Sequence, residues 1–184
     1  IIVAHDLGLT RITYGDGIKP FFNTIRAGQR TKTDTTLWYP KKVYRDTRDN
    51  IWVAEPQSVV KLGNESFRRF DFADSENSTS FVESFNFLQL DEKQLLITSF
   101  PGNIFVYDYE NDTIRQVSKN PQVGEIHIAQ RIADSILLGC RNGIYLLDEM
   151  QYSTSLLLLG GPYVDIKRLE EGRLLACLEN ESVI

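Results

Sequence analysis

The chain has 184 residues, of which 42% are hydrophobic and 11% aromatic; this is enough apolar side chain to fill a core and excludes wholesale disorder. Its formal net charge of -5 at pH 7 argues against broad electrostatic binding to nucleic acid, and no stretch approaches the roughly 18 apolar residues of a membrane-spanning helix. Two cysteines are too few for a disulfide scaffold, so the fold must depend on its core.

Five segments along the chain share one pattern, a short apolar run with a small residue at its third position. The segments are 2–5, 52–55, 96–99, 137–140 and 174–177, and the small residues are Ala4, Ala54, Thr98, Gly139 and Ala176. A turn slot follows each segment and holds Gly8, Ser58, Gly102, Gly143 and Asn180. Glycine and asparagine tolerate the positive φ of tight hairpins, whereas Ser58 does not fit this rule. A second apolar run follows each turn slot, so each unit predicts a β-hairpin.

Two further strands belong to the repeated unit. One is expected before each hairpin, over 43–45, 87–90, 126–128 and 164–166, and one after it, over 66–72, 113–117 and 153–159. The small residues are 50, 44, 41 and 37 residues apart, close to the roughly 40 to 50 residues of a four-stranded propeller blade. A β-sandwich also has short strands, but it would not repeat one register of small residues and glycines five times. The sequence therefore predicts an all-β fold, a β-propeller fragment of about four to five four-stranded antiparallel blades.

The expected organisation in chain order is a blade remnant over 1–14, an insert loop over 15–36, and blades over 37–80, 81–121 and 122–161. A partial blade over 162–184 completes the chain. We expect the strands that carry the small residues to be the innermost ones, because bulky side chains would clash where blades converge on a central channel. Because the chain starts without Met and stops within an apolar run, both ends are expected to be cut by processing or at a cloning boundary.

One stretch resembles a known repeat. Residues 49–54 (Asp-Asn-Ile-Trp-Val-Ala), followed by 59–62, resemble the two-component regulator propeller repeat, in which a polar turn precedes an Asn-(Ile/Leu)-Trp-Ile-Gly-Thr strand. Residues 8–12 and 143–146 are similar to its second half, and the resemblance spans most of the chain. The sequence departs from the pattern because the tryptophan occurs only at Trp52 and Ser58 replaces the following glycine. Residues 137–146 would fit a citron-homology domain nearly as well, and WD-type repeats have similar hairpins.

The resemblance implies an extracytoplasmic, periplasmic sensor module of a bacterial hybrid two-component histidine kinase, with carbohydrate-derived ligands. It implies no enzyme activity in this fragment, although the parent chain would carry histidine kinase activity. The partners it implies are an oligosaccharide, the remaining blades and downstream domains of the parent chain, and a second copy in a homodimer. The alternative is a protein-interaction propeller scaffold, of the citron-homology or WD type, without catalytic activity.

No motif for catalysis, cofactors or metal binding is present, since the sequence has no His-x-Glu-x-x-His, Cys-x-x-Cys or serine elbow. We therefore predict no catalytic residue, no metal site and no cofactor. Cys140 and Cys177 occupy the same slot in neighbouring units, and we expect two buried, unpaired thiols. His127 alternates with isoleucines, and Trp52 lies in an apolar run, so we expect structural roles for both.

The candidate ligand-binding residues lie around the hairpins and the insert. His5 ends the first hairpin strand, and Asp6 adds polarity beside it. Trp38 and Tyr39 follow the insert as an aromatic pair, and apolar sugar faces pack on such rings. Glu55 and Arg141 complete the set, at the ends of equivalent strands.

Overall fold

A computed structural model describes residues 2–5, 8–14, 20–26, 37, 39–63, 67–72, 85–169 and 173–179, and it describes the three strands before residue 27 at the level of the backbone. Every regular element among these residues is a β-strand. The chain falls into two compact units, Ile1–Glu83 and Ser84–Ile184. The predicted all-β fold with four-stranded antiparallel sheets is confirmed.

The first unit contains two sheets. One is a three-stranded meander, and the other is a four-stranded meander in the order β4-β5-β6-β7. Their strands are β1 (Ile2–His5), β2 (Gly8–Tyr14) and β3 (Pro20–Arg26), then β4 (Lys42–Arg45), β5 (Ile51–Glu55), β6 (Ser58–Leu62) and β7 (Phe67–Asp71). The stretch 15–36, expected to be a loop, contains strand β3, which pairs with β2 over seven residue pairs from Gly8↔Arg26 to Tyr14↔Pro20.

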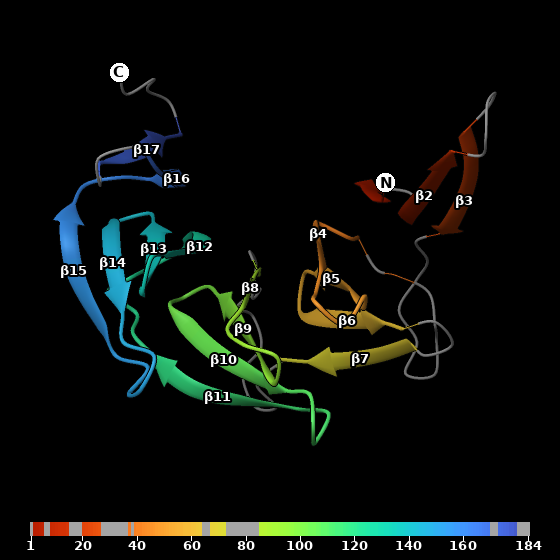
Figure 1. Cartoon of the computed structure of the whole chain (residues 1–184), viewed down its shortest axis with the longest axis horizontal. Helices are drawn as coiled ribbons and strands as arrows, with labels where there is room; N and C mark the ends of the chain where they lie inside the picture. The colour runs from red at the N-terminus through yellow and green to blue at the C-terminus, as the bar shows by residue number, and fades with distance from the viewer. Residues whose placement is uncertain are drawn as a thin grey trace. The chain divides into compact units, whose positions relative to one another are not determined.

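The second unit contains three sheets that follow one another along the chain (Figure 1). Two are complete four-stranded meanders, and the described part of the third is a hairpin. The strands are β8 (Asn86–Gln89), β9 (Gln94–Ser99), β10 (Asn103–Asp108) and β11 (Thr113–Lys119); β12 (Ile126–Ile132), β13 (Ser135–Cys140), β14 (Gly143–Leu147) and β15 (Thr154–Leu159); and β16 (Tyr163–Arg168) with β17 (Leu174–Leu178).

The sheets of this unit are stacked face to face. The middle strand β13 is buried at nearly every residue, instead of at alternate residues, because both of its faces are covered. One core cluster joins Leu96 and Ile104 of one sheet to Ile136 and Leu138 of the next. A second cluster joins Leu137 and Ile144 to the sheet of β16 and β17. Each face of β13 therefore has its own apolar partner.

The strands at the converging edge differ from the prediction. The first strand of each sheet packs against the first strand of the next, β12 lying against both β8 and β16, while β11 and β15 lie at the diverging edge (Figure 1). The small residues lie on the second strands, β5, β9, β13 and β17, so the expectation that these strands are innermost was wrong.

Gly139 shows why the slot is small. A Cβ atom at this position would lie 2.7 Å from Ile128 Cγ2 and 2.9 Å from the backbone oxygen of Tyr163, the first residue of β16. Both distances are shorter than real Cβ contacts, and a backbone oxygen cannot move aside by changing a rotamer. The absence of a side chain at Gly139 therefore allows β16, the first strand of the following sheet, to approach β13 closely.

β-Bulges recur at equivalent places in successive sheets. The pairing of β12 with β13 skips His127, and the pairing of β16 with β17 skips Val164. The outer pairings skip Val117 in β11 and Leu157 in β15 in the same way. A bulge interrupts the ladder, and near the first of these the side chain of Asn86 donates a 2.5 Å hydrogen bond to the carbonyl of Ile126. The bulges thus repeat with the sheets, and one of them lies beside a hydrogen bond between two sheets.

The turn before β5 is held by one carboxylate. Asp46 is buried and accepts hydrogen bonds from the backbone amides of Arg48 and Asn50, each at 2.9 Å, and from the Asn50 side chain at 3.0 Å. Its second oxygen also accepts a 2.8 Å bond from Nε1 of Trp52, which is fully buried. The expected core role of Trp52 is confirmed, and its indole reaches back to the turn that precedes its strand.

Both cysteines are free thiols, and Cys140 is buried as expected, but Cys177 is only partly buried. Burial raises the pKa of Cys140 to about 12. Because the thiolate is the reactive form, native Cys140 should react with maleimide or a disulfide reagent far more slowly than partly exposed Cys177. Mass spectrometry after timed labelling should show one fast site and one site that reacts only on unfolding. Equal labelling rates for the two cysteines in the folded protein would contradict this buried position.

Candidate ligand-binding end of the sheets

Each sheet has two ends with different chemistry. We call one the hairpin end; in the second unit it comprises the hairpins 100–102 and 141–142 and the connections 120–125 and 160–162. The opposite end, which we call the turn end, comprises the turns 90–93, 109–112, 133–134 and 148–153.

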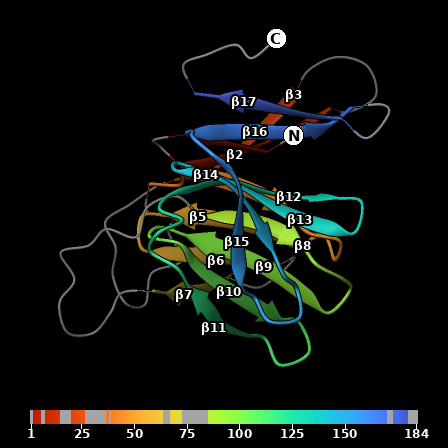
Figure 2. The ribbon, with the colours of Figure 1, turned by 90° about the vertical axis from the view of Figure 1, so that its left-hand side faces the viewer.

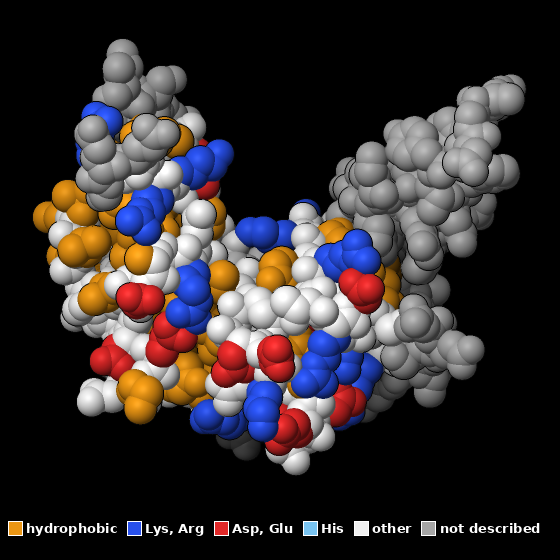
Figure 3. Space-filling view, in the orientation of Figure 1, with side chains coloured by type: hydrophobic (Ala, Val, Ile, Leu, Met, Phe, Trp, Pro, Cys, Tyr) orange, Lys and Arg blue, Asp and Glu red, His pale blue; other side chains and the backbone are white. Residues whose placement is uncertain are grey.

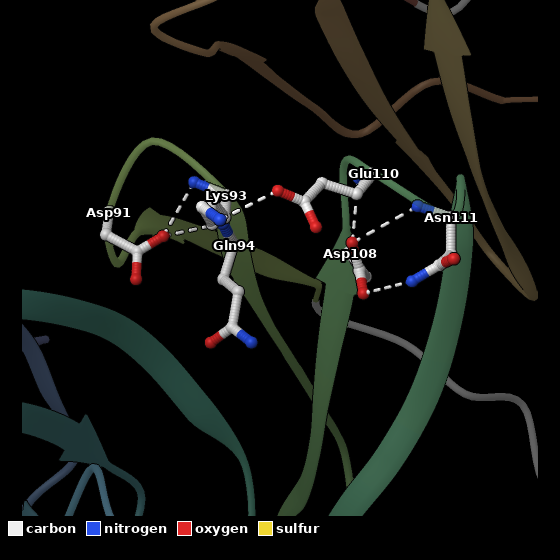
Figure 4. Close-up of polar contacts among 6 residues, drawn as sticks. All are labelled: Asp91, Lys93, Gln94, Asp108, Glu110 and Asn111. Atoms are coloured by element: carbon white, nitrogen blue, oxygen red, sulfur yellow. Dashed lines mark hydrogen bonds and ion pairs between the residues drawn. The ribbon is translucent and has the colours of Figure 1, made fainter.

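Carboxylates at the turn end are occupied by the turns themselves (Figure 4). Asp91 accepts from the amides of Lys93 and Gln94 at 2.7 and 2.8 Å. Asp108 accepts from the amides of Glu110 and Asn111. Asp148 accepts in the same way from the amides of Met150 and Gln151. This is the capping chemistry that makes aspartate a frequent turn residue.

Two ion pairs also lie at the turn end. Lys93 Nζ lies 2.8 Å from Glu110 Oε1, and this hydrogen bond and the glutamate's charge raise the pKa of the lysine (Figure 4). Hydrogen bonds from Asn111 and from the amide of Glu110 lower the pKa of Asp108. The Arg131 guanidinium donates hydrogen bonds to both carboxylate oxygens of Glu149, at 2.6 and 2.7 Å. The turn end therefore uses its polar groups to hold its own structure.

The hairpin end is held mainly by its backbone. The amide of Arg141 donates to the carbonyl of Glu125 at 2.8 Å, and the Asn142 side chain donates to the carbonyl of Gln122 at 3.1 Å. On the other side, a Cβ at Gly161 would lie 2.6 Å from the Arg141 oxygen, and φ there is +136°, so glycine is required. The hairpin 141–142 is thus fixed between two connections, and the Asn142 side chain contributes to this, while the Arg141 side chain stays exposed.

Two side chains at this end are suited to recognition. Arg141 is exposed, and none of the residues that the structure describes accepts a hydrogen bond from its guanidinium or pairs with its charge. Phe100 lies at the start of the neighbouring hairpin and is 38% exposed, although its carbonyl is fixed by Asn103 Nδ2 at 2.9 Å. A cation and an aromatic ring on rigid hairpins are typical of a binding surface.

His127 lies at the same end, on the bulge near the start of β12. Its Nδ1 is 3.9 Å from Glu125 Oε1, and its Nε2 is buried without a hydrogen-bond partner among the described residues. Sequence reasoning gave His127 a structural role and did not single out Phe100. A bulge and a hairpin tip depend on strand pairing, which alternation along one strand does not reveal.

The predicted site residues are only partly brought together. Arg141 lies at the hairpin end, and Tyr39, 54% exposed, precedes the first strand of its sheet at the equivalent end. His5 is the last residue of β1, where it pairs with Gly8, and its side chain is not described. Asp6 and Trp38 lie outside the described residues. The two units are not placed relative to each other, so only Arg141 among these belongs to the hairpin end of the second unit.

Glu55 is engaged inside its own sheet. It is 1% exposed, and one carboxylate oxygen accepts from Ser58 Oγ at 2.6 Å and from Arg69 Nε at 3.0 Å. Ser58 directly follows a two-residue turn and has a negative φ, so glycine is not needed at this position. Its hydroxyl instead donates a hydrogen bond to the carboxylate of Glu55. The prediction that Glu55 contacts a ligand gains no support from this geometry.

No group of three or more His, Cys, Asp or Glu side chains that could hold a metal ion occurs in the described part of the chain. The same residues include no helix with the length and hydropathy needed to cross a membrane.

Comparisons with known proteins give a fold. No family model matches the chain, and no curated protein matches it by sequence. Among solved structures it is similar to the extracellular domain of a protein assigned as a hybrid two component system, BT4673 from B. thetaiotaomicron, with a TM-score of 0.69 and 16% identity over 95% of this chain and 26% of that one. It is also similar to PorZ, an essential bacterial surface component of the type-IX secretion system of Porphyromonas gingivalis (TM-score 0.55, 20% identity, 76% of this chain and 19% of that one). A third similar structure is BBS1N, solved in complex with ARL6DN (TM-score 0.61, 14% identity, 97% of this chain and 55% of that one).

The chain thus spans about a quarter of the two-component protein's extracellular domain. At these identities the similarity establishes the fold that the chain shares with such extracellular sensor regions.

Proposed function

We propose that this chain is part of the extracytoplasmic sensor region of a bacterial hybrid two-component system, where the hairpin end of its sheets binds a ligand. The observation that carries the proposal is the similarity over 95% of the chain to an extracellular domain of this kind. In this role the fragment binds without catalysis, and any kinase activity belongs to another part of the parent chain.

The proposed ligand is derived from a carbohydrate. A sugar presents apolar C–H faces that pack on an aromatic ring such as Phe100, and hydroxyl groups that accept hydrogen bonds from a guanidinium such as Arg141. The planar fork of Arg141 would pair still better with the carboxylate of an acidic sugar. Acidic oligosaccharides are therefore expected to bind more tightly than neutral ones of the same length.

The test is a thermal-shift screen of neutral and acidic oligosaccharides against the 184-residue chain, followed by calorimetry on the compounds that raise the melting temperature. Replacing Arg141 by alanine should weaken binding of an acidic oligosaccharide by about tenfold or more, since it removes charge-assisted hydrogen bonds. Arg168→Ala is the matched control, because Arg168 is an exposed arginine of the same unit at the turn end of β16. Equal losses in both variants would contradict a site at the hairpin end.

A protein-interaction scaffold is the second candidate, favoured by the similarity to BBS1N, a structure solved with a partner protein. It predicts that no oligosaccharide, neutral or acidic, raises the melting temperature or gives heat in calorimetry. The same screen therefore separates the two functions.

A further inference from the structure

His127 is the one histidine of the second unit, since the other histidine of the chain is His5. Histidine is the side chain whose charge ordinarily changes between about pH 5 and 8. Asp, Glu, Lys and Arg side chains, which lie interspersed on the face shown in Figure 3, ordinarily keep their charges in this range. A change of charge in the second unit between these pH values is therefore expected at His127.

The surroundings of the His127 ring suit its neutral form. The side chain is 18% exposed, and Nε2 is buried without a hydrogen-bond partner among the described residues, while Nδ1 lies 3.9 Å from Glu125 Oε1. A neutral ring can carry its hydrogen on Nδ1 and leave Nε2 as an acceptor, whereas a protonated ring carries hydrogens on both nitrogens. Protonation would thus bury a charged donor without an acceptor, which costs more than leaving a neutral acceptor unpaired.

The charged groups near β12 offset little of this cost. β12 lies between β8 and β16, and neither β8 nor β9 carries a titratable side chain (Figure 2). The Glu125 carboxylate is 28% exposed, so water weakens its attraction for a protonated ring. Asp165 of β16 lies 3.2 Å from Lys167, and Arg131 is paired at the turn end. The other titratable groups on β13, on β16 and in the adjoining hairpin are Cys140, Arg141, Tyr163 and Arg168. None of these groups forms a hydrogen bond with Nε2.

A short segment connects His127 to the hairpin that carries Arg141. The carbonyl of Glu125, two residues before His127, accepts the 2.8 Å hydrogen bond from the Arg141 amide. A Cβ atom at Gly124 would lie 3.9 Å from Arg141 Cβ, so the arginine packs beside this connection. His127 itself is the residue that the pairing of β12 with β13 skips, and a bulge residue can change its backbone angles without loss of a ladder hydrogen bond. Movement of His127 would therefore reach Arg141 through the connection 120–125.

We propose that His127 is a proton-sensitive switch of the hairpin end. The neutral ring keeps the connection 120–125 in place beside Arg141, and protonation displaces the ring from its buried position and loosens the hairpin 141–142. The inference rests on the proposed function, because ligand binding at Arg141 is the property that protonation controls. The ligand binds the form with neutral His127, so the affinity is highest near pH 8 and falls as the pH decreases toward 5.5. By reciprocity, the bound ligand opposes proton uptake at His127.

The first test needs no ligand. In two-dimensional NMR spectra of the ¹⁵N-labelled 184-residue chain, the Arg141 amide signal should move between pH 8 and 5.5 along the titration curve of the His127 ring. In His127→Gln, which places a neutral side chain at this position, the Arg141 signal should keep its pH 8 position throughout. His5→Gln is the matched control; it removes the other histidine and should leave the Arg141 titration as in the parent chain. An Arg141 signal that does not move in the parent chain, or that moves equally in His127→Gln, would overturn the proposal.

The second test measures the regulation by calorimetry with tri-galacturonate, or with a tighter-binding acidic oligosaccharide from the thermal-shift screen. The affinity should fall about fivefold or more between pH 8 and 5.5 in the parent chain, a coupling of ordinary size for two linked sites. In His127→Gln it should stay the same at both pH values. Equal affinities in the parent chain, or tighter binding at pH 5.5, would overturn the switch. If no oligosaccharide binds at either pH, the proposed function fails, while the NMR titration still decides whether His127 controls the hairpin.

Discussion

Replacing Gly139 by valine is expected to destabilise the second unit by about 3 kcal/mol, at the upper end of overpacking substitutions. The new Cβ alone would lie 2.9 Å from the Tyr163 backbone oxygen, and this atom can move only if β16 moves away from β13. The loss should therefore include weaker docking of β16 and β17 onto the sheet β12–β15. Urea unfolding followed by circular dichroism measures the stability, and hydrogen exchange at β16 measures the docking.

Thr98→Val is the matched control, because it places valine at the same slot of the preceding sheet. Thr98 is fully buried, and its hydroxyl has no hydrogen-bond partner among the described residues, so valine fills the same volume without an unsatisfied polar group. Stability should stay the same or rise by up to about 1 kcal/mol. If valine costs the same at both positions, the close approach of successive sheets at Gly139 is not the reason for the small residue.

Replacing Asp46 by alanine should destabilise the first unit by about 3 kcal/mol, since it leaves a buried indole N–H and two backbone amides without their acceptor. Trp38 and Trp52 both belong to this unit, so tryptophan fluorescence during urea unfolding reports on it alone. Arg45→Ala provides the control; it removes an exposed ion pair with Asp49 and should cost less than about 0.5 kcal/mol. Similar losses in the two variants would show that the carboxylate of Asp46 does not hold this turn.

Strands and turns could be predicted because they are encoded locally. A hairpin needs alternating or apolar runs on each side of a short turn, and the glycine at 102 has the positive φ, +66°, that such turns require. Repetition then identified the four-stranded unit, since each sheet is a meander of neighbours in sequence. The capping aspartates of the turn end follow the same local chemistry, and Asp108 and Asp148 repeat it at equivalent turns.

Packing between sheets could not be read in this way. The sequence showed that position 139 is small, but the cause is Tyr163 on the next sheet, and the wrong strands were therefore taken to be innermost. Strand β3 was missed because it lies in a stretch with glycines on both sides, which favours the interpretation of a loop.

In the candidate site, too, local features could be predicted from the sequence and tertiary contacts could not. Arg141 was predicted from its place beside a hairpin, which is local, and it lies at the hairpin end. Glu55 has the same local position, yet Arg69, fourteen residues away in β7, engages its carboxylate. Phe100 was not predicted from the sequence; it belongs to the candidate site because the structure shows that its side chain is exposed.

Hydrogen exchange with and without the tightest-binding oligosaccharide tests most directly whether the hairpin end is the recognition surface. The expected result is slower exchange at 100–102, 120–125 and 141–142, with no change at 90–93, 109–112 or 148–153. Slower exchange only at the turns 90–93, 109–112 and 148–153, or a screen in which no oligosaccharide binds, would contradict a recognition surface at the hairpin end.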